Sequence, residues 1–264
     1  MENNLWQHIL HVRNTSPLVH NITNFVVMNN TANALLAVGA SPIMAHAKPE
    51  VLDMVKISNA LVVNIGTLDE YWEESMLLAA NKADQLAKPW ILDPVGAGAT
   101  AYRDSVLSKL LALNPTVIRG NASEIIALAK ANTVATKGVD STAQSDEAVE
   151  AAKTLVQNYN SVVCISGETD IIINGNHIIY LKNGNPMMTK VTGLGCTASA
   201  MIGAFIGVIE NKTEAVVSAM SLIGVAGELA AKKSSGPGSL QLNLIDKLYN
   251  LTEKEFLTHL KLVE

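Results

Sequence analysis

The chain has 264 residues, and 48% of them are apolar, so it is long enough to build one large domain around a sizeable core. Charged residues make up only 16%, the formal net charge is −5, and the basic runs of nucleic-acid-binding surfaces do not occur in the sequence. The two cysteines, Cys164 and Cys196, exclude a disulfide framework and favour a reducing cytosol.

Two segments free of Asp, Glu, Lys and Arg, 16–47 and 191–209, have the length of a membrane span. Asparagines interrupt the first and glycines dilute the second, so we expect both to be buried in protein. We expect part of segment 16–47 at a subunit interface, because interface centres are depleted of charge. Residues 1–4 lack the basic and apolar regions of a secretory signal, and a cytoplasmic protein is predicted.

From residue 60 onwards, short apolar runs alternate with longer amphipathic segments. In chain order, they predict a strand at 60–66, a helix at 68–87, a strand at 90–94, a helix at 102–113, a strand at 116–118, helices at 121–131 and 145–159, and a strand at 161–166. The residues Gly175 and Asn176 lie between apolar runs at 169–174 and 177–181, which is a hairpin signal. Three apolar helices follow, near 196–209, 213–232 and 239–250.

The alternation of apolar strands with helices predicts an α/β fold with a mostly parallel sheet covered on both faces. The hairpin adds antiparallel strands at one edge of this sheet. The sequence has neither a linker nor a repeat, so we expect a single domain over residues 1–264. Ligands of such sheets bind beyond the carboxyl ends of the strands, which makes the residues that follow each strand the candidates for a site.

The loops after the second and third predicted strands carry candidate metal-binding acids. Asp93 ends the second predicted strand beside a glycine turn, where it either caps the turn or binds a hydrated Mg²⁺. Glu124 follows the third strand at capping-box spacing from Asn121, and alternatively supplies a second carboxylate for the metal. Arg119 is a candidate phosphate ligand in the same loop.

Two further loops suit a phosphate group. Ser166 ends the fourth predicted strand, where its hydroxyl bonds a phosphate or caps the turn. Residues 193–196, Gly-Leu-Gly-Cys, open an apolar helix, and we call them the anion loop because backbone N–H groups at a helix N-terminus attract anions. The loop is not a Walker motif, since no Gly-Lys-Ser/Thr follows the glycines.

Three roles are open for Cys196, the last residue of the anion loop. It is an inert buried residue, a nucleophile that needs a neighbouring base, or a thiol whose pKa the helix N-terminus lowers. Cys164 lies in an apolar strand and is expected only to fill the core. The histidines show no metal-binding spacing. His20 and His46 lie in the uncharged segment, where they either contact a substrate or are structural, and we expect the structural role.

Taken together, these motifs resemble the hydroxyethylthiazole kinase family of the ribokinase-like superfamily. The resemblance rests on segments at 20–24, 29–33, 39–45, 64–67, 93–97, 119–124, 192–196 and 236–239. It implies a ribokinase-like three-layer sandwich and transfer of the γ-phosphoryl group of ATP to the hydroxyl of 4-methyl-5-(2-hydroxyethyl)thiazole, in thiamine biosynthesis or salvage. It also implies Mg²⁺ dependence and a homotrimer with thiazole sites at the subunit interfaces.

Carried over to this chain, the resemblance assigns a role to each loop. Met44 and Gly193 contact the thiazole, Met44 from across the interface. Arg119 and Ser166 bind ATP phosphates, and Asn24 points toward the phosphate end of the nucleotide. Asp93 and Glu124 are the acids on the metal side. The catalytic loop comprises Gly193, Gly195 and Cys196.

Other ribokinase-like kinases carry Asp where this chain has Cys196. Phosphoryl transfer passes through a loose transition state, so a strong base for the acceptor hydroxyl contributes little. We therefore hypothesise that Cys196 acts mainly through its backbone N–H and its size. On this hypothesis, Cys196→Asp keeps or raises turnover, and Cys196→Ala leaves measurable activity.

Four alternative functions remain open from the loops alone. The same scaffold also suits a hydroxymethylpyrimidine kinase or an ATP-dependent dehydratase. A Cys-dependent acyl transferase would be inactivated by alkylation of the thiol and indifferent to ATP. A nucleotide-binding regulatory protein would bind ATP without turnover. The complete set of family motifs favours the thiazole kinase.

Overall fold

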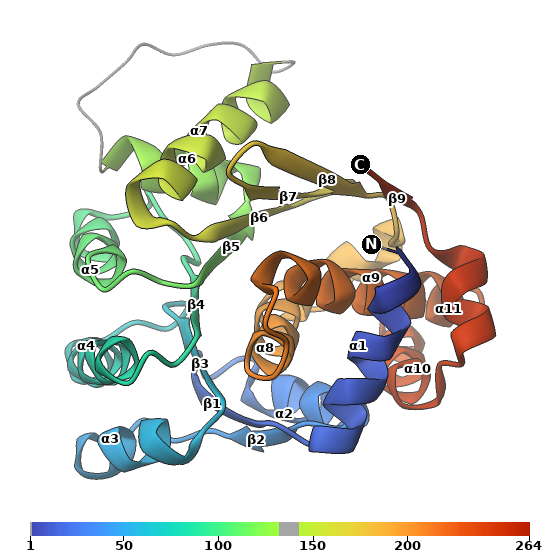
Figure 1. The fold of residues 1–264 in the computed structure, drawn as a ribbon, viewed down its shortest axis with the longest axis horizontal. Coiled ribbons are helices and arrows are strands. Elements are labelled where there is room, and N and C mark those ends of the chain that lie inside the picture. The colour runs from blue at the N-terminus through green and yellow to red at the C-terminus, as the bar shows by residue number, and fades with distance from the viewer. Residues whose placement is uncertain (1, 132–142) are drawn as a thin grey trace.

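A nine-stranded sheet forms the middle layer of the computed structural model, which describes residues 2–131 and 143–264. Its strands run in the order β2-β1-β3-β4-β5-β6-β7-β8-β9 (Figure 1). Their bounds are β1 Leu18–Ile22, β2 Ser41–Ile43, β3 Ala60–Asn64, β4 Trp90–Asp93, β5 Val117–Asn121, β6 Val162–Ser166, β7 Asp170–Asn174, β8 His177–Leu181 and β9 Leu262–Val263.

The sheet has a parallel part and an antiparallel part. Strands β2, β1, β3, β4, β5 and β6 pair in parallel, so their carboxyl ends lie along one edge. Strands β6, β7, β8 and β9 pair antiparallel, and the β7–β8 hairpin turns at Gly175, whose φ is 58°. The predicted α/β class, the parallel sheet and the hairpin are therefore confirmed.

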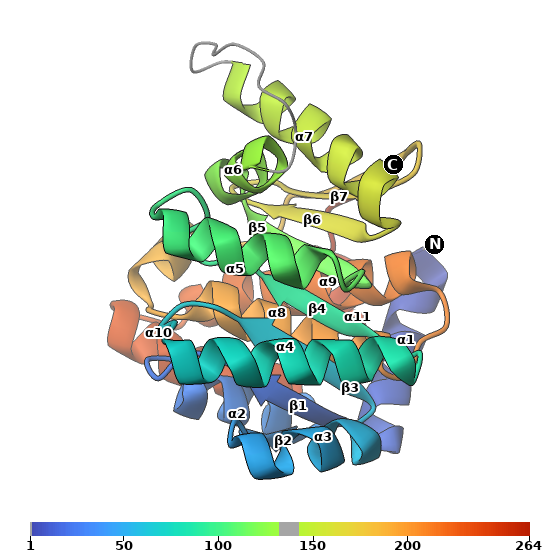
Figure 2. The same ribbon diagram turned by 90° about the vertical axis from the view of Figure 1, so that its left-hand side faces the viewer.

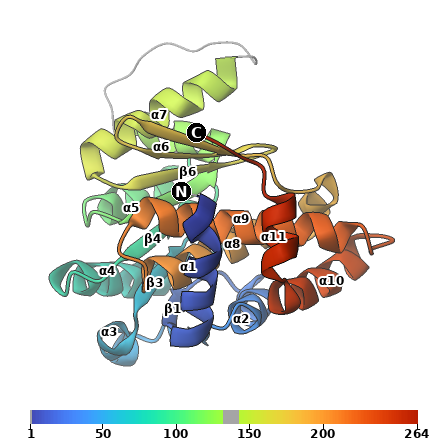
Figure 3. The same ribbon diagram turned by 45° about the vertical axis from the view of Figure 1, so that its right-hand side comes forward.

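Helices cover both faces of the sheet, in agreement with the prediction. One face carries α3 Lys48–Ile57, α4 Glu70–Gln85, α5 Ala101–Leu111, α6 Ala122–Ala131 and α7 Ala143–Tyr159. Figure 2 shows this layer from the front, with α4 and α5 lying in front of the strands. The other face carries α1 Glu2–Thr15, α2 Met28–Ala37, α8 Leu194–Ile206, α9 Lys212–Ala231, α10 Pro237–Asn250 and α11 Glu253–His259. Figure 3 shows that α11 leads the chain back to β9 at the antiparallel end of the sheet.

The two cores form because side chains alternate along each strand. On β3, Val62 faces the α8 layer, whereas Leu61 and Val63 face the α4 layer. Helix α8 lies very close to the sheet, since a Cβ atom on Gly203 would come within 2.6 Å of Val62 Cγ2. This close packing brings the first turn of α8 to the carboxyl edge of the strands.

The predicted elements differ from the observed ones mainly at their ends. The strand predicted at 116–118 extends to Asn121, because its last residues pair with β6. The apolar helices begin about two residues earlier than predicted, at Leu194 and Pro237 for α8 and α10. The five elements before residue 60 had no prediction, and neither had α11 or β9.

One helix among the described residues, α9, is long and apolar enough to cross a membrane. However, 83% of its most apolar window is buried inside the protein, which is typical of a core helix. It packs against the sheet and against α8, α10 and α1. Both uncharged segments singled out in the sequence are also part of the fold, and the second forms α8.

Candidate active site

Five loops meet at the carboxyl edge of the parallel strands, together with the start of α8. Register explains part of this arrangement, because Asn64 at the end of β3 lies opposite Asp93 at the end of β4. Likewise Asn121 at the end of β5 lies opposite Ser166 at the end of β6. Side chains far apart in the sequence are thus held side by side.

A buried chain of hydrogen bonds joins these loops. The Nδ2 of Asn64 donates to Asp93 Oδ2 at 2.7 Å, and the Nδ2 of Asn24 donates to Asn64 Oδ1 at 2.9 Å. Asn24 Nδ2 also lies 3.5 Å from the Sγ of Cys196. On the α8 side, the Ser199 hydroxyl donates to Asp93 Oδ2 at 2.8 Å. Asp93 is therefore connected to the predicted acceptor side of the site.

Asp93 is almost inaccessible, with only 1% of its surface exposed. Burial raises its pKa, and the neighbouring Glu124 charge adds to that rise. The Arg119 charge and the hydrogen bonds from Ser199 and Asn64 act in the opposite direction, but only in part. A cation bound here would favour the ionised carboxylate, because an opposite charge stabilises the charged form.

Arg119 and Ser166, the two predicted phosphate ligands, lie together. The Nη2 of Arg119 donates to Ser166 Oγ at 2.7 Å. A Cβ atom on Gly195 would come within 2.7 Å of Arg119 Nη1, so the guanidinium packs directly on the anion loop. Within the described part of the chain, no group accepts a hydrogen bond from the buried Nε of Arg119. A buried donor without a partner is costly, and an anion would relieve that cost.

Glu124 caps the helix that carries it. Its Oε2 accepts from the N–H of Asn121 at 2.8 Å, and Asn121 Oδ1 accepts from the N–H of Glu124 at 2.9 Å. This reciprocal pair confirms the capping box at the start of α6. The other oxygen, Oε1, accepts from the N–H of Gly96 at 3.1 Å, which joins the loops after β4 and β5.

The donor set suits a magnesium ion held partly by a substrate. Among the described residues, no group of three or more His, Cys, Asp and Glu side chains is placed to hold a metal ion. Mg²⁺ needs no such group, since it usually keeps several waters and binds one or two carboxylates together with substrate phosphates. Asp93 and Glu124, which interact electrostatically, match that requirement.

The anion loop has the predicted position and backbone geometry. Gly193 adopts φ of 79°, a left-handed conformation that favours glycine, and α8 begins at the next residue. The first N–H groups of a helix have no partner within it, so this end of α8 presents donors to the site. A Cβ atom on Gly193 would overlap Val27, which leaves no room for another residue.

Cys196 is half-buried in the first turn of α8. Burial raises the pKa of its thiol, and the neighbouring Asp93 carboxylate raises it further. Hydrogen bonds from Asn64 and Asn24 and the Arg119 charge offset this rise only in part. The direction is opposite to the lowered pKa considered as one alternative, and burial and Asp93 are its main causes. Cys164 is fully buried in β6, in agreement with the prediction that it only fills the core.

A cavity of about 730 Å³ opens beside Arg119, a volume typical of ligand pockets. Arg119, Ser166 and Gly195 line one part of it. Further lining comes from the segment between β8 and α8 and from α9. The predicted ATP ligands Arg119 and Ser166 thus face a space of suitable size.

Met44 lies apart from this cavity, directly after the short strand β2 at the parallel edge of the sheet. It is half-buried. Ala45 follows Met44 in the chain, and its backbone oxygen lies 2.7 Å from the Nε2 of His20, to which it is hydrogen-bonded. His20 thus holds the loop that carries Met44, while no hydrogen-bond partner of its buried Nδ1 is found among the described residues.

Two residues of the site had no role in the sequence analysis. Arg103 on α5 donates to the backbone oxygens of Ile65 and Val95 at 2.6 and 2.9 Å, and to Gly66 at 2.8 Å, which ties the loops after β3 and β4 together. Asp170 at the start of β7 lines the cavity and accepts from the N–H of Gly167 at 3.1 Å. Burial raises the pKa of Asp170 to about 6.

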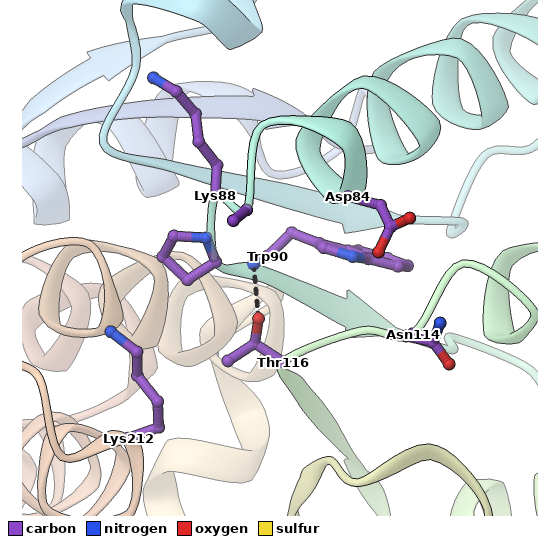
Figure 4. Close-up of a pocket in the computed structure, with 8 residues that line it drawn as sticks. Asp84, Lys88, Trp90, Asn114, Thr116 and Lys212 are labelled. Carbon is purple, nitrogen blue, oxygen red and sulfur yellow. Dashed lines mark hydrogen bonds between the residues drawn. The ribbon is translucent and has the colours of Figure 1, made fainter.

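A second cavity, of about 240 Å³, lies at the amino ends of β4 and β5, opposite the site (Figure 4). Its two lysines already have partners. Lys88 Nζ donates to the backbone oxygens of Lys56 and Ser58 at the C-terminal end of α3, and Lys212 Nζ donates to those of Ile206 and Ile209 at 2.8 Å. These ammonium groups cap the ends of helices, so this cavity is explained by structure.

Comparison with known proteins gives matches over nearly the whole chain. The model of the "Hydroxyethylthiazole kinase family" matches residues 9–254. A hydroxyethylthiazole kinase from Syntrophus aciditrophicus is 56% identical over 98% of this chain and 97% of its own length. A relative of the same name from Vibrio atlanticus is 51% identical over 95% of each chain.

Solved structures agree with these sequence matches. The hydroxyethylthiazole kinase protein of Pyrococcus horikoshii superposes with a TM-score of 0.92 at 40% identity, covering 99% of this chain and all of its own. The Staphylococcus aureus pyridoxal kinase in complex with ADP gives a TM-score of 0.63 at 16% identity, covering 80% of this chain and 88% of its own. The second likeness shows a shared fold alone.

Proposed function

The chain belongs to the hydroxyethylthiazole kinase family, and we propose that it transfers the γ-phosphoryl group of ATP to the hydroxyl of 4-methyl-5-(2-hydroxyethyl)thiazole. The family, the ribokinase-like fold and the kinase activity predicted from the sequence are confirmed. One observation in the site carries the proposal. Arg119 has a buried Nε with no partner among the residues that the structure describes, packs against Gly195 and lines the large cavity, as a ligand of a polyphosphate would.

At the phosphate end, Arg119 and the Ser166 hydroxyl bind the nucleotide, and N–H groups of the anion loop stabilise the transferred group. Charge stabilisation and positioning supply most of the catalysis of phosphoryl transfer. Asn24 lies on the same side, hydrogen-bonded to Asn64 and close to Cys196. Its amide is placed to orient groups at the junction between nucleotide and acceptor.

Mg²⁺ is the proposed metal, with Asp93 and Glu124 as the acids that hold it. When bound, it neutralises negative charge on the phosphates. The hydrogen bonds of Asp93 to Asn64 and Ser199 fix the direction of its carboxylate. Glu124 is fixed in turn by two backbone N–H groups, from Gly96 and Asn121.

On the acceptor side, Cys196 orients the alcohol without acting as a strong base. Its raised pKa keeps the proton on Sγ near neutral pH. The hydroxyl proton of the acceptor need not leave early in a loose transition state. Gly193 contacts the thiazole, and Met44 contacts it from a neighbouring subunit of a homotrimer.

We further propose that residues 1–264 form a single domain and that the protein is cytoplasmic.

The test is mass detection of phosphorylated hydroxyethylthiazole after incubation of the protein with the thiazole, ATP and Mg²⁺. We expect the product together with an equal amount of ADP. Arg119→Ala should abolish most of it, whereas Lys109→Ala, which removes an exposed cation on α5, should not. A protein that phosphorylates hydroxymethylpyrimidine but not the thiazole would contradict the proposal.

A further inference from the structure

One wall of the large cavity is formed by an irregular segment, residues 182–190, which we call the strap. It connects β8 to the anion loop and contains the short helix η1, Pro186–Lys190. Asn183, Gly184 and Met188 of the strap line the cavity. The position of this wall therefore depends on anchors outside the sheet.

The main anchor is the carboxylate of Glu228 on α9, which is only 9% exposed. A single oxygen, Oε1, accepts from Asn183 Nδ2 and from the N–H of Gly184, both at 3.1 Å. It also pairs with Lys261 Nζ at 2.7 Å. Burial alone would raise the pKa of this carboxyl, but these three donors lower it below its ordinary value. Gly184 has φ of 142°, so the turn that presents its N–H favours glycine.

The strap also lies directly on the backbone of α9. A Cβ atom on Gly224 would come within 2.8 Å of Asn183 Cβ, and one on Gly227 would overlap the Sδ of Met188. Gly224 and Gly227, in the turn of α9 that immediately precedes Glu228, thus let the strap pack directly on the helix backbone. Met188, which lines the cavity, packs against this turn.

The first residues of the strap are also hydrogen-bonded to the C-terminal segment of the chain. Asn183 Nδ2 donates to the backbone oxygen of His259 at 2.8 Å, and Asn183 Oδ1 accepts from the N–H of Lys261 at 2.8 Å. The N–H of Lys182 donates to the oxygen of Lys261 at 2.9 Å. Residues 259–261 therefore hold the beginning of the strap in place.

We propose that Glu228 is a positioning residue for the nucleotide, and that its carboxylate holds the strap as one wall of the ATP cavity. This inference rests on the proposed function, because it takes ATP as the occupant of the cavity. Glu228 does not line the cavity itself and acts through Asn183 and Gly184. Its removal changes the binding of the nucleotide and leaves the thiazole side intact.

The experiment compares Glu228→Ala and Glu228→Gln with the wild-type chain in steady-state kinetics. We expect Glu228→Ala to raise the KM for ATP roughly tenfold, because hydrogen bonds to a charged acceptor are strong, with kcat and the KM for the thiazole nearly unchanged. Glu228→Gln keeps an acceptor oxygen and should raise the KM for ATP less than Glu228→Ala does. The matched control is Glu214→Gln, which alters a carboxylate in the first turn of the same helix.

Binding of ADP measured by calorimetry separates this inference from the proposed function. If the wild-type chain binds ADP but phosphorylates no thiazole, only the proposed function fails. The ADP affinities of the Glu228 variants and the wild-type chain then test whether Glu228 positions the strap. A folded Glu228→Ala protein with wild-type KM for ATP and wild-type ADP affinity would overturn the inference, as would a wild-type chain that binds no ADP. Should Glu228→Ala not fold, Glu228→Gln and Lys261→Met, which changes a half-exposed side chain, decide by the same measurements.

Discussion

At the scale of single residues, Cys196 shows how environment decides chemistry. A thiol in the first turn of a helix is a candidate for a lowered pKa, yet burial and Asp93 raise it here. We expect Cys196→Ala to reduce kcat by less than the 100-fold or more typical of a lost general base, about 10-fold at most. Turnover of the purified variant checks this, with Cys196→Asp expected to keep or raise it. Complete loss in a folded Cys196→Ala protein would establish an essential thiol.

Asp170 predicts a dependence of stability on pH. Its pKa in the folded chain, about 6, lies above the unfolded value of 3.8, so the folded state binds the extra proton between these values. The free energy of unfolding should therefore fall as pH rises from about 4 to about 6, by at most about 3 kcal/mol. Urea-unfolding curves recorded between pH 4 and pH 6 measure this change in the free energy of unfolding.

The matched variants for this pH profile are Asp170→Asn and Asp246→Asn. The first removes the titrating group but keeps an oxygen for the N–H of Gly167, so the fall between pH 4 and 6 should shrink. The second changes an exposed residue on α10 and should leave the profile as it is. Identical profiles for all three proteins would mean that the carboxyl of Asp170 titrates normally.

At the scale of elements, the start of α8 depends on two properties of Gly193. Its φ of 79° is unfavourable for other residues, and a side chain there would also overlap Val27. Gly175 has φ of 58° but open space around it. Gly193→Ala should thus lower stability by about 1–3 kcal/mol more than Gly175→Ala, the cost of overpacking alone. Thermal unfolding of both variants tests this. Equal losses of stability would mean that the positive φ alone causes the effect and that the overlap with Val27 adds nothing.

Strand ends were the part of the site that sequence could predict. Asp93, Arg119 and Ser166 each end an apolar run, and parallel strands bring such ends together. Ser199 was missed because its partner Asp93 lies 106 residues away, and nothing local reveals that α8 crosses the sheet so closely. Glu228 was missed for the same reason, since Asn183 and Lys261 reach it from other elements.

The first sixty residues show the opposite case, a region in which the pattern hides the elements. Strand β1 contains His20 and Asn21, which are buried although polar, so it does not read as an apolar run. His20 is accommodated by the backbone oxygen of Ala45, a contact that only the fold creates. Strand β2 has three residues, one of them Pro42, which suits an edge strand but gives almost no signal.

At the scale of the whole molecule, the uncharged N-terminal segment exposes apolar side chains. Phe25, Val26 and Leu36 are 61%, 65% and 59% exposed. Phe25 and Val26 follow the carboxyl end of β1, and Leu36 lies on α2. Such exposure beside a site suggests a surface that another subunit covers. It supports the predicted trimer, in which Met44 of one subunit completes the site of the next.

Mixing two variants of low activity tests this arrangement directly. Met44→Glu and Arg119→Ala homotrimers should each lose most of their activity, because every site lacks one residue. In mixed trimers, some interfaces pair the intact Met44 of one subunit with the intact Arg119 of its neighbour, so about a quarter of wild-type activity should return on random assembly. Sedimentation measures the trimer, and product mass measures activity. If mixed trimers form but gain no activity, Met44 acts within its own subunit, and a site shared between copies is wrong.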